Sequence, residues 1–190
     1  HGYGHDDENG HHRVSYIDGV CDENIDDIKN EGLRNNFGEL EEMLRSDRSE
    51  VQLEATKRFR QLLQVERDPM LQELVDRDIV PKLLRFLKDK SNSSLQVEAL
   101  WALTNIAAGT TEQTHLLIKN NAVPTLVSLL TSTHHEILEQ AVWVLGNIAG
   151  DDSSARDTVL QAGALQPLLN CMDNNNKPSL LLSLWPCHTK

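Results

Sequence analysis

The stretch AVWVLGNIAGDD (residues 141–152) repeats a pattern that occurs earlier in the chain as ALWALTNIAAGT (residues 99–110). In each copy an asparagine follows a tryptophan by four positions, and the two copies are 42 residues apart. A fixed period between about 20 and 50 residues is typical of solenoids, in which each repeat packs on the next. The two segments therefore predict a repeat architecture.

A second pattern follows the same period. The run VPKLLRFL (residues 80–87) matches VPTLVSLL (residues 123–130) and then LQPLL (residues 165–169). Apolar residues recur at three- and four-residue spacing, and no segment alternates with period two, so every element is expected to be a helix. The chain is thus predicted to be an all-α solenoid of about three to four repeats.

Each repeat is expected to hold two short helices and a long third helix that carries the tryptophan and asparagine. The first helices are predicted at residues 113–119 and 154–161, and a weaker early unit begins near Phe37. Prolines near the starts of the second helices and glycines at the junctions agree with these boundaries. The third helices are expected near residues 50–63, 95–107 and 136–149.

The rest of the chain differs in composition. Residues 1–35 are expected to be a disordered acidic tail, residues 36–172 the repeats, and residues 173–190 a truncated or divergent C-terminal end. With 29 Asp and Glu against 18 Lys and Arg, the net charge is −11. This balance argues against nucleic-acid binding and favours a basic partner.

Two further classes are disfavoured by the sequence. No apolar run reaches the roughly 20 residues that a membrane-spanning helix needs. Cys21, Cys171 and Cys187 have no metal-ligand spacing, so reduced thiols in the cytosol or nucleus are expected rather than a disulfide.

The tryptophans and asparagines form what we call the Trp-Asn ladder: Trp101, Asn105, Trp143 and Asn147. Residues four apart share one face of a helix, and asparagine in a helix interior costs roughly 0.5 kcal/mol relative to alanine. An amide can donate to and accept from the backbone of an extended peptide, and tryptophans can flank a lysine stem. Asp151 would lie close to the positive charge of that lysine. The alternative is that these side chains only fill space between repeats.

The segments ALWALTNIAAGTTEQT (residues 99–114) and EQAVWVLGNIAGDDSSARDTVLQAGALQPLL (residues 139–169) resemble the armadillo repeats of the importin alpha family, adaptors that recognise nuclear localisation signals. The resemblance implies a right-handed superhelical solenoid that acts in cytoplasm and nucleus. It also implies a site for lysine- and arginine-rich signal peptides, with Thr114 and Asp151 clasping the principal lysine. The implied peptide-binding residues are Trp101, Asn105, Gly109, Thr114, Gln140, Trp143, Asn147 and Asp151.

The sequence departs from the family in two regions. The family's basic N-terminal segment binds importin beta, whereas residues 1–35 contain only Arg13, Lys29 and Arg34 as basic residues other than histidine, so importin beta binding is not expected. Near the other end, Trp185 is followed by Pro186 and lacks an asparagine four positions later. A third tryptophan–asparagine pair, which would be a third rung of the ladder, is therefore absent there.

The sequence also leaves room for other functions. An armadillo scaffold for another peptide partner in adhesion or signalling remains the alternative, although such a scaffold typically needs basic residues on its binding face. His134, His135 and Glu136 invite an enzymatic or metal interpretation, but they fall in a predicted turn without partner ligands. The histidines of residues 1–12 are better explained by a solvated segment than by a metal site. No catalytic residue, cofactor or metal is expected.

Overall fold

The structure is a computed structural model of the chain, and it describes residues 37–65 and 77–173. No strand occurs in these two ranges, in agreement with the all-α prediction. The predicted tail, residues 1–35, and nearly all of the predicted C-terminal end lie outside the described residues. The helices are α2 (Phe37–Arg45), α3 (Ser49–Val65), α5 (Ile79–Phe86), α6 (Ser93–Ala107), α7 (Thr111–Lys119), α8 (Ala122–Leu129), α9 (His135–Ala149), α10 (Ser153–Gln161) and α11 (Leu165–Asp173).

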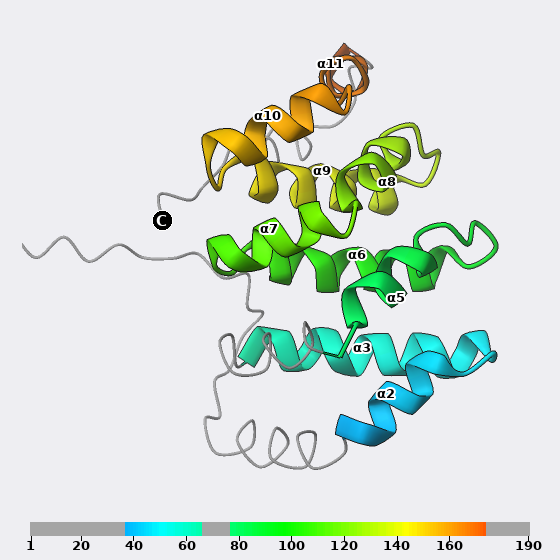
Figure 1. Ribbon diagram of the computed structural model, residues 1–190. Coiled ribbons are helices and arrows are strands. Elements are labelled where there is room, and N and C mark those ends of the chain that lie inside the picture. The colour runs from blue at the N-terminus through cyan, green and yellow to red at the C-terminus, as the bar shows by residue number, and fades with distance from the viewer. Residues whose placement is uncertain (1–36, 66–76, 174–190) are drawn as a thin grey trace, which may run out of the picture.

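The long helices α3, α6 and α9 are stacked in chain order, and shorter helices lie along them (Figure 1). Helix α6 packs on both α3 and α9, and these two helix pairs make the most extensive contacts between different repeats. These three helices coincide with the predicted third helices to within two residues. The stacking places equivalent positions of successive repeats beside one another, as in other solenoids.

The corner before each second helix has a left-handed backbone. Asp78 and Asn121 have φ values of 57° and 60°, and Gly163 has a φ of 81°. The three positions follow the repeat period, since they lie 43 and 42 residues apart. Asp, Asn and Gly are the residues that tolerate this conformation best, so local chemistry fixes the chain reversal in each repeat.

Side chains cap the helices that follow the ladder. Thr110 and Gln113 form a capping box at the start of α7, in which each side chain bonds the other residue's backbone amide. At the equivalent corner, Asp152 Oδ1 accepts a hydrogen bond of 2.7 Å from the amide of Ala155 in α10. Both turns are therefore fixed by local hydrogen bonds.

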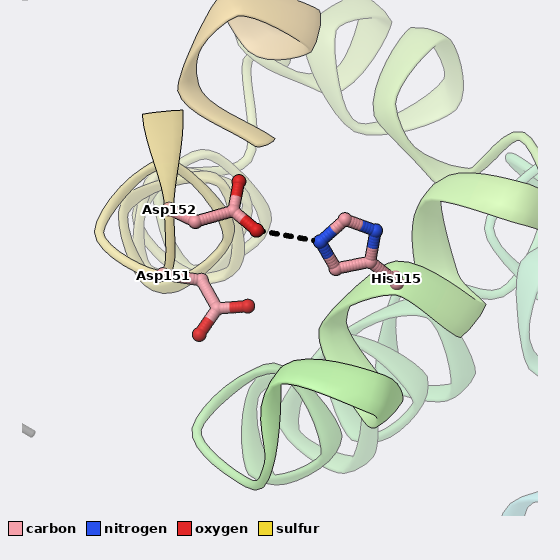
Figure 2. A group of neighbouring side chains, drawn as sticks. All are labelled: His115, Asp151 and Asp152. Atoms are coloured by element: carbon pink, nitrogen blue, oxygen red, sulfur yellow. Dashed lines mark hydrogen bonds and ion pairs between the residues drawn. The ribbon is translucent and has the colours of Figure 1, made fainter. Parts of the chain in front are cut away.

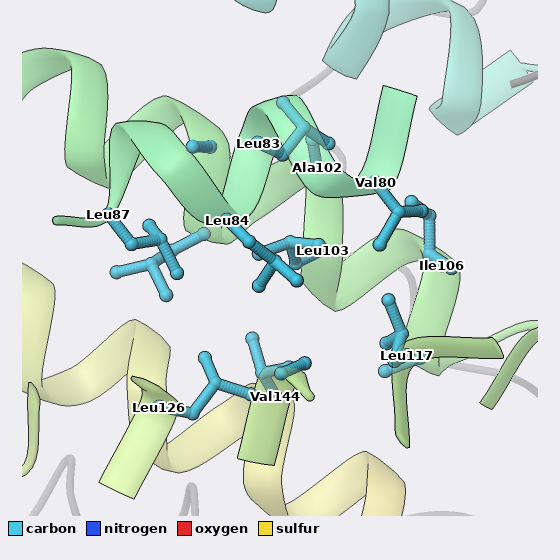
Figure 3. Packing of buried hydrophobic residues seen from close by; sticks show 14 of the residues in the cluster. Val80, Leu83, Leu84, Leu87, Ala102, Leu103, Ile106, Leu117, Leu126 and Val144 are labelled. Carbon is cyan, nitrogen blue, oxygen red and sulfur yellow. The ribbon is translucent and has the colours of Figure 1, made fainter. Parts of the chain in front are cut away.

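One apolar core runs through the stacked repeats. Figure 3 shows Val80, Leu83 and Leu84 of α5 close to Leu103 and Ile106 of α6. The core extends through Leu117, Leu126 and Val144 into α7, α8 and α9. Continuous burial across repeat boundaries provides the stability that a single repeat cannot supply.

The predictions about membrane spans and cysteines concern residues that the structure describes in part. Within the described ranges, no helix combines the length and hydropathy needed to cross a membrane. Cys171 is a free thiol whose Sγ lies 3.6 Å from the carbonyl oxygen of Leu130, and burial raises its pKa. Cys21 and Cys187 lie outside the described residues.

Candidate functional site

The two ladder tryptophans lie at equivalent positions of the packed helices α6 and α9. Trp143 is 37% exposed, which makes it one of the few large apolar side chains at the surface of the described solenoid. Trp101 is half-buried. An exposed tryptophan on an otherwise well-packed repeat is a candidate contact for a partner, because packing alone would bury it.

Trp101 is covered in part by a cation from the preceding repeat. Arg60 Cζ lies 5.6 Å from the centroid of the Trp101 ring. Arg60 Nε also donates a hydrogen bond of 2.6 Å to Glu98 Oε2, one turn before Trp101 on α6. The two tryptophans therefore share a sequence pattern but have different surroundings.

The two asparagines also differ. Asn147 Nδ2 donates to the backbone carbonyl oxygen of Thr104, 3.4 Å away on α6. Asn105 Nδ2 is buried and has no hydrogen-bond partner within the described ranges. A buried donor without a partner costs free energy, so an acceptor supplied by a ligand would be favourable at Asn105. Both asparagines are half-buried overall.

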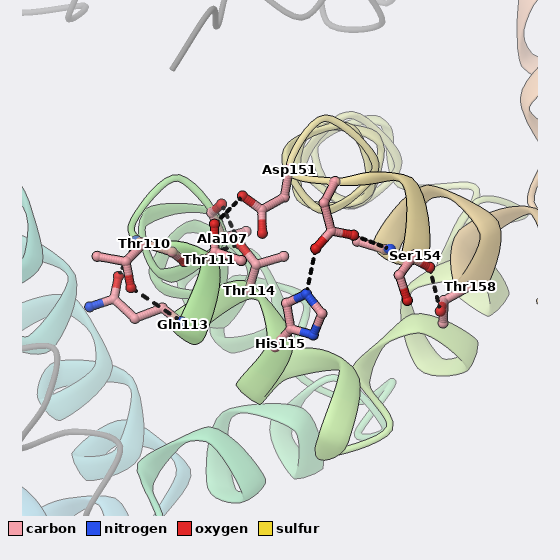
Figure 4. A network of polar contacts seen from close by, with 11 residues as sticks. Ala107, Thr110, Thr111, Gln113, Thr114, His115, Asp151, Ser154 and Thr158 are labelled. Atoms are coloured by element: carbon pink, nitrogen blue, oxygen red, sulfur yellow. Dashed lines mark hydrogen bonds and ion pairs between the residues drawn. The ribbon is translucent and has the colours of Figure 1, made fainter.

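Asp151 lies beyond the ladder at the turn between α9 and α10. Its Oδ1 accepts a hydrogen bond of 3.1 Å from Thr111 Oγ1 of the preceding repeat. Thr114 is fully buried, and its hydroxyl lies 3.4 Å from the carbonyl oxygens of Ala107 and Thr110 (Figure 4). Asp151 thus bonds Thr111, and Thr114, which the resemblance pairs with Asp151 around a ligand lysine, lies one turn later on α7.

Gly109 and Gln140, the remaining predicted site residues, have clear packing roles. A Cβ atom on Gly109 would lie 1.7 Å from Gln113 Oε1, so the glycine makes room for the capping box. Gln140 is 8% exposed, and its Oε1 lies 3.5 Å from Thr104 Oγ1. The structure thus brings Trp101, Asn105, Trp143, Asn147 and Asp151 to the ladder and its edge, and holds Thr114 and Gln140 below the surface.

A second acidic carboxylate lies next to Asp151. Asp152 Oδ2 is 2.7 Å from His115 Nε2 of α7 (Figure 2). The Ala155 amide and then His115 hold the pKa of Asp152 below its ordinary value. This contact ties two repeats together and keeps the edge of the ladder anionic near neutral pH.

His115, Asp151 and Asp152 offer ligand atoms within 4.8 Å of one another, the spacing at which a metal ion could be held. Their observed contacts are hydrogen bonds: Asp152 caps α10 and pairs with His115, and Asp151 accepts from Thr111. These contacts account for the arrangement without an ion. The histidines of residues 1–12 lie outside the described residues.

Sequence reasoning did not identify Arg60, Glu98 or the His115–Asp152 pair. Counting back one period of 42 residues from Trp101 leads to Phe59, which is fully buried in the core. The residue that reaches the ring is the next one, Arg60. The arginine next to the expected ladder position was the sequence feature that could have indicated this contact with Trp101. The Asp152 cap could have been expected from its place before α10, but its histidine partner comes from another repeat.

The comparisons with known proteins agree with this geometry. Residues 67–108 and 110–150 match the Armadillo/beta-catenin-like repeat family. A solved designed armadillo repeat protein in complex with the peptide (KR)4 is similar in structure. Its TM-score is 0.74, its sequence is 28% identical, and the match covers 82% of this chain and 66% of the designed one. The prediction of an armadillo fold is confirmed.

Curated relatives are importin alpha subunits. Importin subunit alpha-2 of Arabidopsis thaliana is 49% identical over 136 residues, which is 72% of this chain and 25% of the relative. Importin subunit alpha-1b of Oryza sativa subsp. japonica is 46% identical over 138 residues, which is 73% of this chain and 26% of the relative. This chain thus spans about a quarter of the length of these relatives. In sequence, the chain is thus similar to importin alpha subunits across its armadillo-repeat solenoid.

Proposed function

We propose that the chain binds extended, lysine- and arginine-rich nuclear localisation signals along the Trp-Asn ladder, as part of an adaptor for nuclear import. The observation that carries the proposal is the recurrence of a solvent-accessible tryptophan with its asparagine on the adjacent helices α6 and α9. The family's members are adaptors rather than enzymes, and this chain is expected to bind its partners without chemical change.

The spacing of the ladder suits an extended peptide. Packed helices lie about 8 to 10 Å apart, and an extended chain advances about 3.3 Å per residue. Side chains about three residues apart on the peptide would therefore meet successive rungs. An amide beside each ring can satisfy the peptide backbone, which has no strand partner there. The unpartnered amide nitrogen of Asn105 supports this role, after a rotation of the side chain that brings it to a peptide carbonyl.

Charge at the edge of the ladder supports a basic ligand. Asp151 and Asp152 follow the second rung, and the lowered pKa of Asp152 keeps that carboxylate ionised near neutral pH. A lysine stem can lie against tryptophan rings while its ammonium group reaches carboxylates beyond them. The designed armadillo protein that resembles this chain was solved with a peptide of alternating lysine and arginine, which is the ligand chemistry proposed here.

The family also suggests where the chain acts and with whom. We infer residence in both cytoplasm and nucleus, as an import adaptor requires. Importin beta is not expected to bind residues 1–35, because they carry only Arg13, Lys29 and Arg34 as basic residues other than histidine. An importin beta pull-down with this chain tests that expectation, and recovery of importin beta would contradict it.

The central test is a titration of the purified chain with a lysine-rich peptide, followed by tryptophan fluorescence and calorimetry. A peptide with each lysine replaced by glutamate serves as the control. We expect saturable binding of the lysine-rich peptide alone. Equal binding of both peptides, or binding of neither, would remove the proposal.

A further inference from the structure

One face of the first ladder tryptophan is already occupied by a cation of the protein itself. Arg60 reaches Trp101 from α3, so the ring face that it covers is the one nearer to α3. Its guanidinium carbon lies 5.6 Å from the ring centroid, within the distance at which a cation is attracted to a tryptophan face. This is the kind of contact that a peptide lysine would otherwise make.

Glu98 holds Arg60 in this position. The Arg60 and Glu98 side chains are 23% and 17% exposed, and their hydrogen bond of 2.6 Å joins α3 to α6. Both residues stand on long helices whose contact is among the most extensive between repeats. A partly buried ion pair on two rigid elements is held better than an exposed pair, because less side-chain freedom is lost in forming it.

We propose that Arg60 closes the Trp-Asn ladder at Trp101, which means that it blocks the side of this ring that faces α3. Arg60 thereby determines at which positions of a bound peptide a lysine or arginine side chain can contact the ladder. The inference rests on the proposed function. A peptide lysine can enter between Trp101 and Trp143, on the side of Trp101 that faces α9. On the α3 side a lysine would have to displace Arg60 and leave Glu98 without its partner, and it would gain only the contact that Arg60 loses.

The second tryptophan shows the contrast. Within residues 37–65 and 77–173, no cation covers the Trp143 ring as Arg60 covers Trp101. Trp143 is also more exposed, so both its exposure and its free ring surface suit an external ligand. The register of a peptide is therefore fixed by a closed end at α3 and an accessible ring on α9.

Arg60→Gln in the full chain tests the closure, and Arg58→Gln is its matched control. Arg58 lies on the same helix and pairs with Glu54 at 2.8 Å, so the control changes the net charge equally without touching Trp101. Both variants are titrated with the lysine-rich peptide and with versions in which each lysine in turn is replaced by alanine. Glu98→Gln, with Glu54→Gln as its control, tests the same pair from the other side.

We expect Arg60→Gln to bind the lysine-rich peptide about two- to fivefold more tightly than Arg58→Gln does, the range of one exposed cation–π contact. One lysine of the peptide whose replacement by alanine does not change the affinity for the original chain should, with Arg60→Gln, weaken binding when it is replaced. Glu98→Gln releases Arg60 from the partner that holds it, so it should bind the lysine-rich peptide more tightly than Glu54→Gln does, and equal binding of these two variants would count against the closure. This second comparison decides the question if Arg60→Gln folds poorly in a thermal scan.

Two outcomes overturn the inference, and they differ from each other. If the original chain binds the peptide but Arg60→Gln matches Arg58→Gln and no lysine becomes newly sensitive, the closure by Arg60 is wrong while the proposed function stands. If neither the original chain nor any variant binds the lysine-rich peptide, the proposed function fails and the role of Arg60 fails with it.

Discussion

The two rungs of the ladder have the same sequence pattern and different environments. At the first rung, Trp101 lies under Arg60 and the Asn105 amide nitrogen lacks a partner. At the second rung, Trp143 is more exposed and Asn147 donates to Thr104 of the preceding repeat. The surroundings differ because Arg60 of α3 covers the Trp101 ring, whereas no cation within residues 37–65 and 77–173 covers the Trp143 ring. A repeat motif therefore specifies position, and the adjacent repeat decides what that position can bind.

The largest expected effect concerns the exposed rung. Trp143→Ala should weaken lysine-peptide binding by about 1 to 3 kcal/mol, the range for an aromatic side chain at the centre of an interface. Its melting temperature should change little, because the ring is 37% exposed and is not part of the apolar core. Calorimetric titration and a thermal scan on the same sample measure both quantities. A sharp loss of stability with unchanged affinity would identify Trp143 as a packing residue.

The next effect distinguishes the covered rung. Trp101→Ala should lower the free energy of unfolding by about 1 to 2 kcal/mol, because it removes a half-buried ring and the partner of Arg60. Chemical denaturation of the Trp101 and Trp143 variants in parallel gives the comparison. Equal stability of the two variants would mean that the Arg60 contact contributes nothing to the fold.

The asparagines should separate in the same experiment. Asn105→Ala and Asn147→Ala are each expected to weaken peptide binding by about 1 kcal/mol, the net contribution of one hydrogen bond. Only Asn147→Ala should also destabilise the fold, since only its amide donates to another repeat in the described structure. Denaturant midpoints and peptide affinities for both variants test this. A stability loss at Asn105 alone would reverse the assignment of the two amides.

The smallest expected effect comes from the turns that follow the rungs. Asp152 has a lowered pKa in the folded chain, so its stabilising contribution is present above the ordinary Asp value of 3.8 and is lost as the pH falls through the lower folded value. The equivalent cap on α7 is the neutral Thr110. Asp152→Asn should keep a cap on α10 and reduce the acid sensitivity of the melting temperature. An unchanged pH profile would show that Asp152 does not link stability to pH.

The sequence was sufficient to predict the helices because their period is visible in the residues themselves. Asp78, Asn121 and Gly163 follow that period and share a backbone preference, so local chemistry and repeat length agree. The position of Asn147 one turn after Trp143 on α9 also followed from helical spacing. These features depend on positions within one repeat, which a single sequence records directly.

Contacts between repeats were harder to predict. The 42-residue count led to Phe59, whereas the residue over Trp101 is Arg60, because a one-residue step on a helix turns a side chain by about 100°. Thr111 and Thr114 lie on the same short helix, and only the structure shows that Thr111 reaches Asp151 while Thr114 is buried. Side-chain partners across a repeat boundary depend on the angle between helices, which the spacing of residues does not contain.

Gly109 has a consequence for how substitutions combine. Its missing Cβ leaves room for Gln113, whose side chain bonds the Thr110 amide at 2.8 Å. Gly109→Ala would push that side chain away and leave the amide unbonded, whereas with a shortened residue at position 113 only the 3.1 Å approach of the added Cβ to the Ile106 carbonyl oxygen would remain. The costs of changing the two positions are thus non-additive, and the second change is cheaper once the first is made. The conformation of the turn after the first rung therefore depends on residues 109 and 113 jointly.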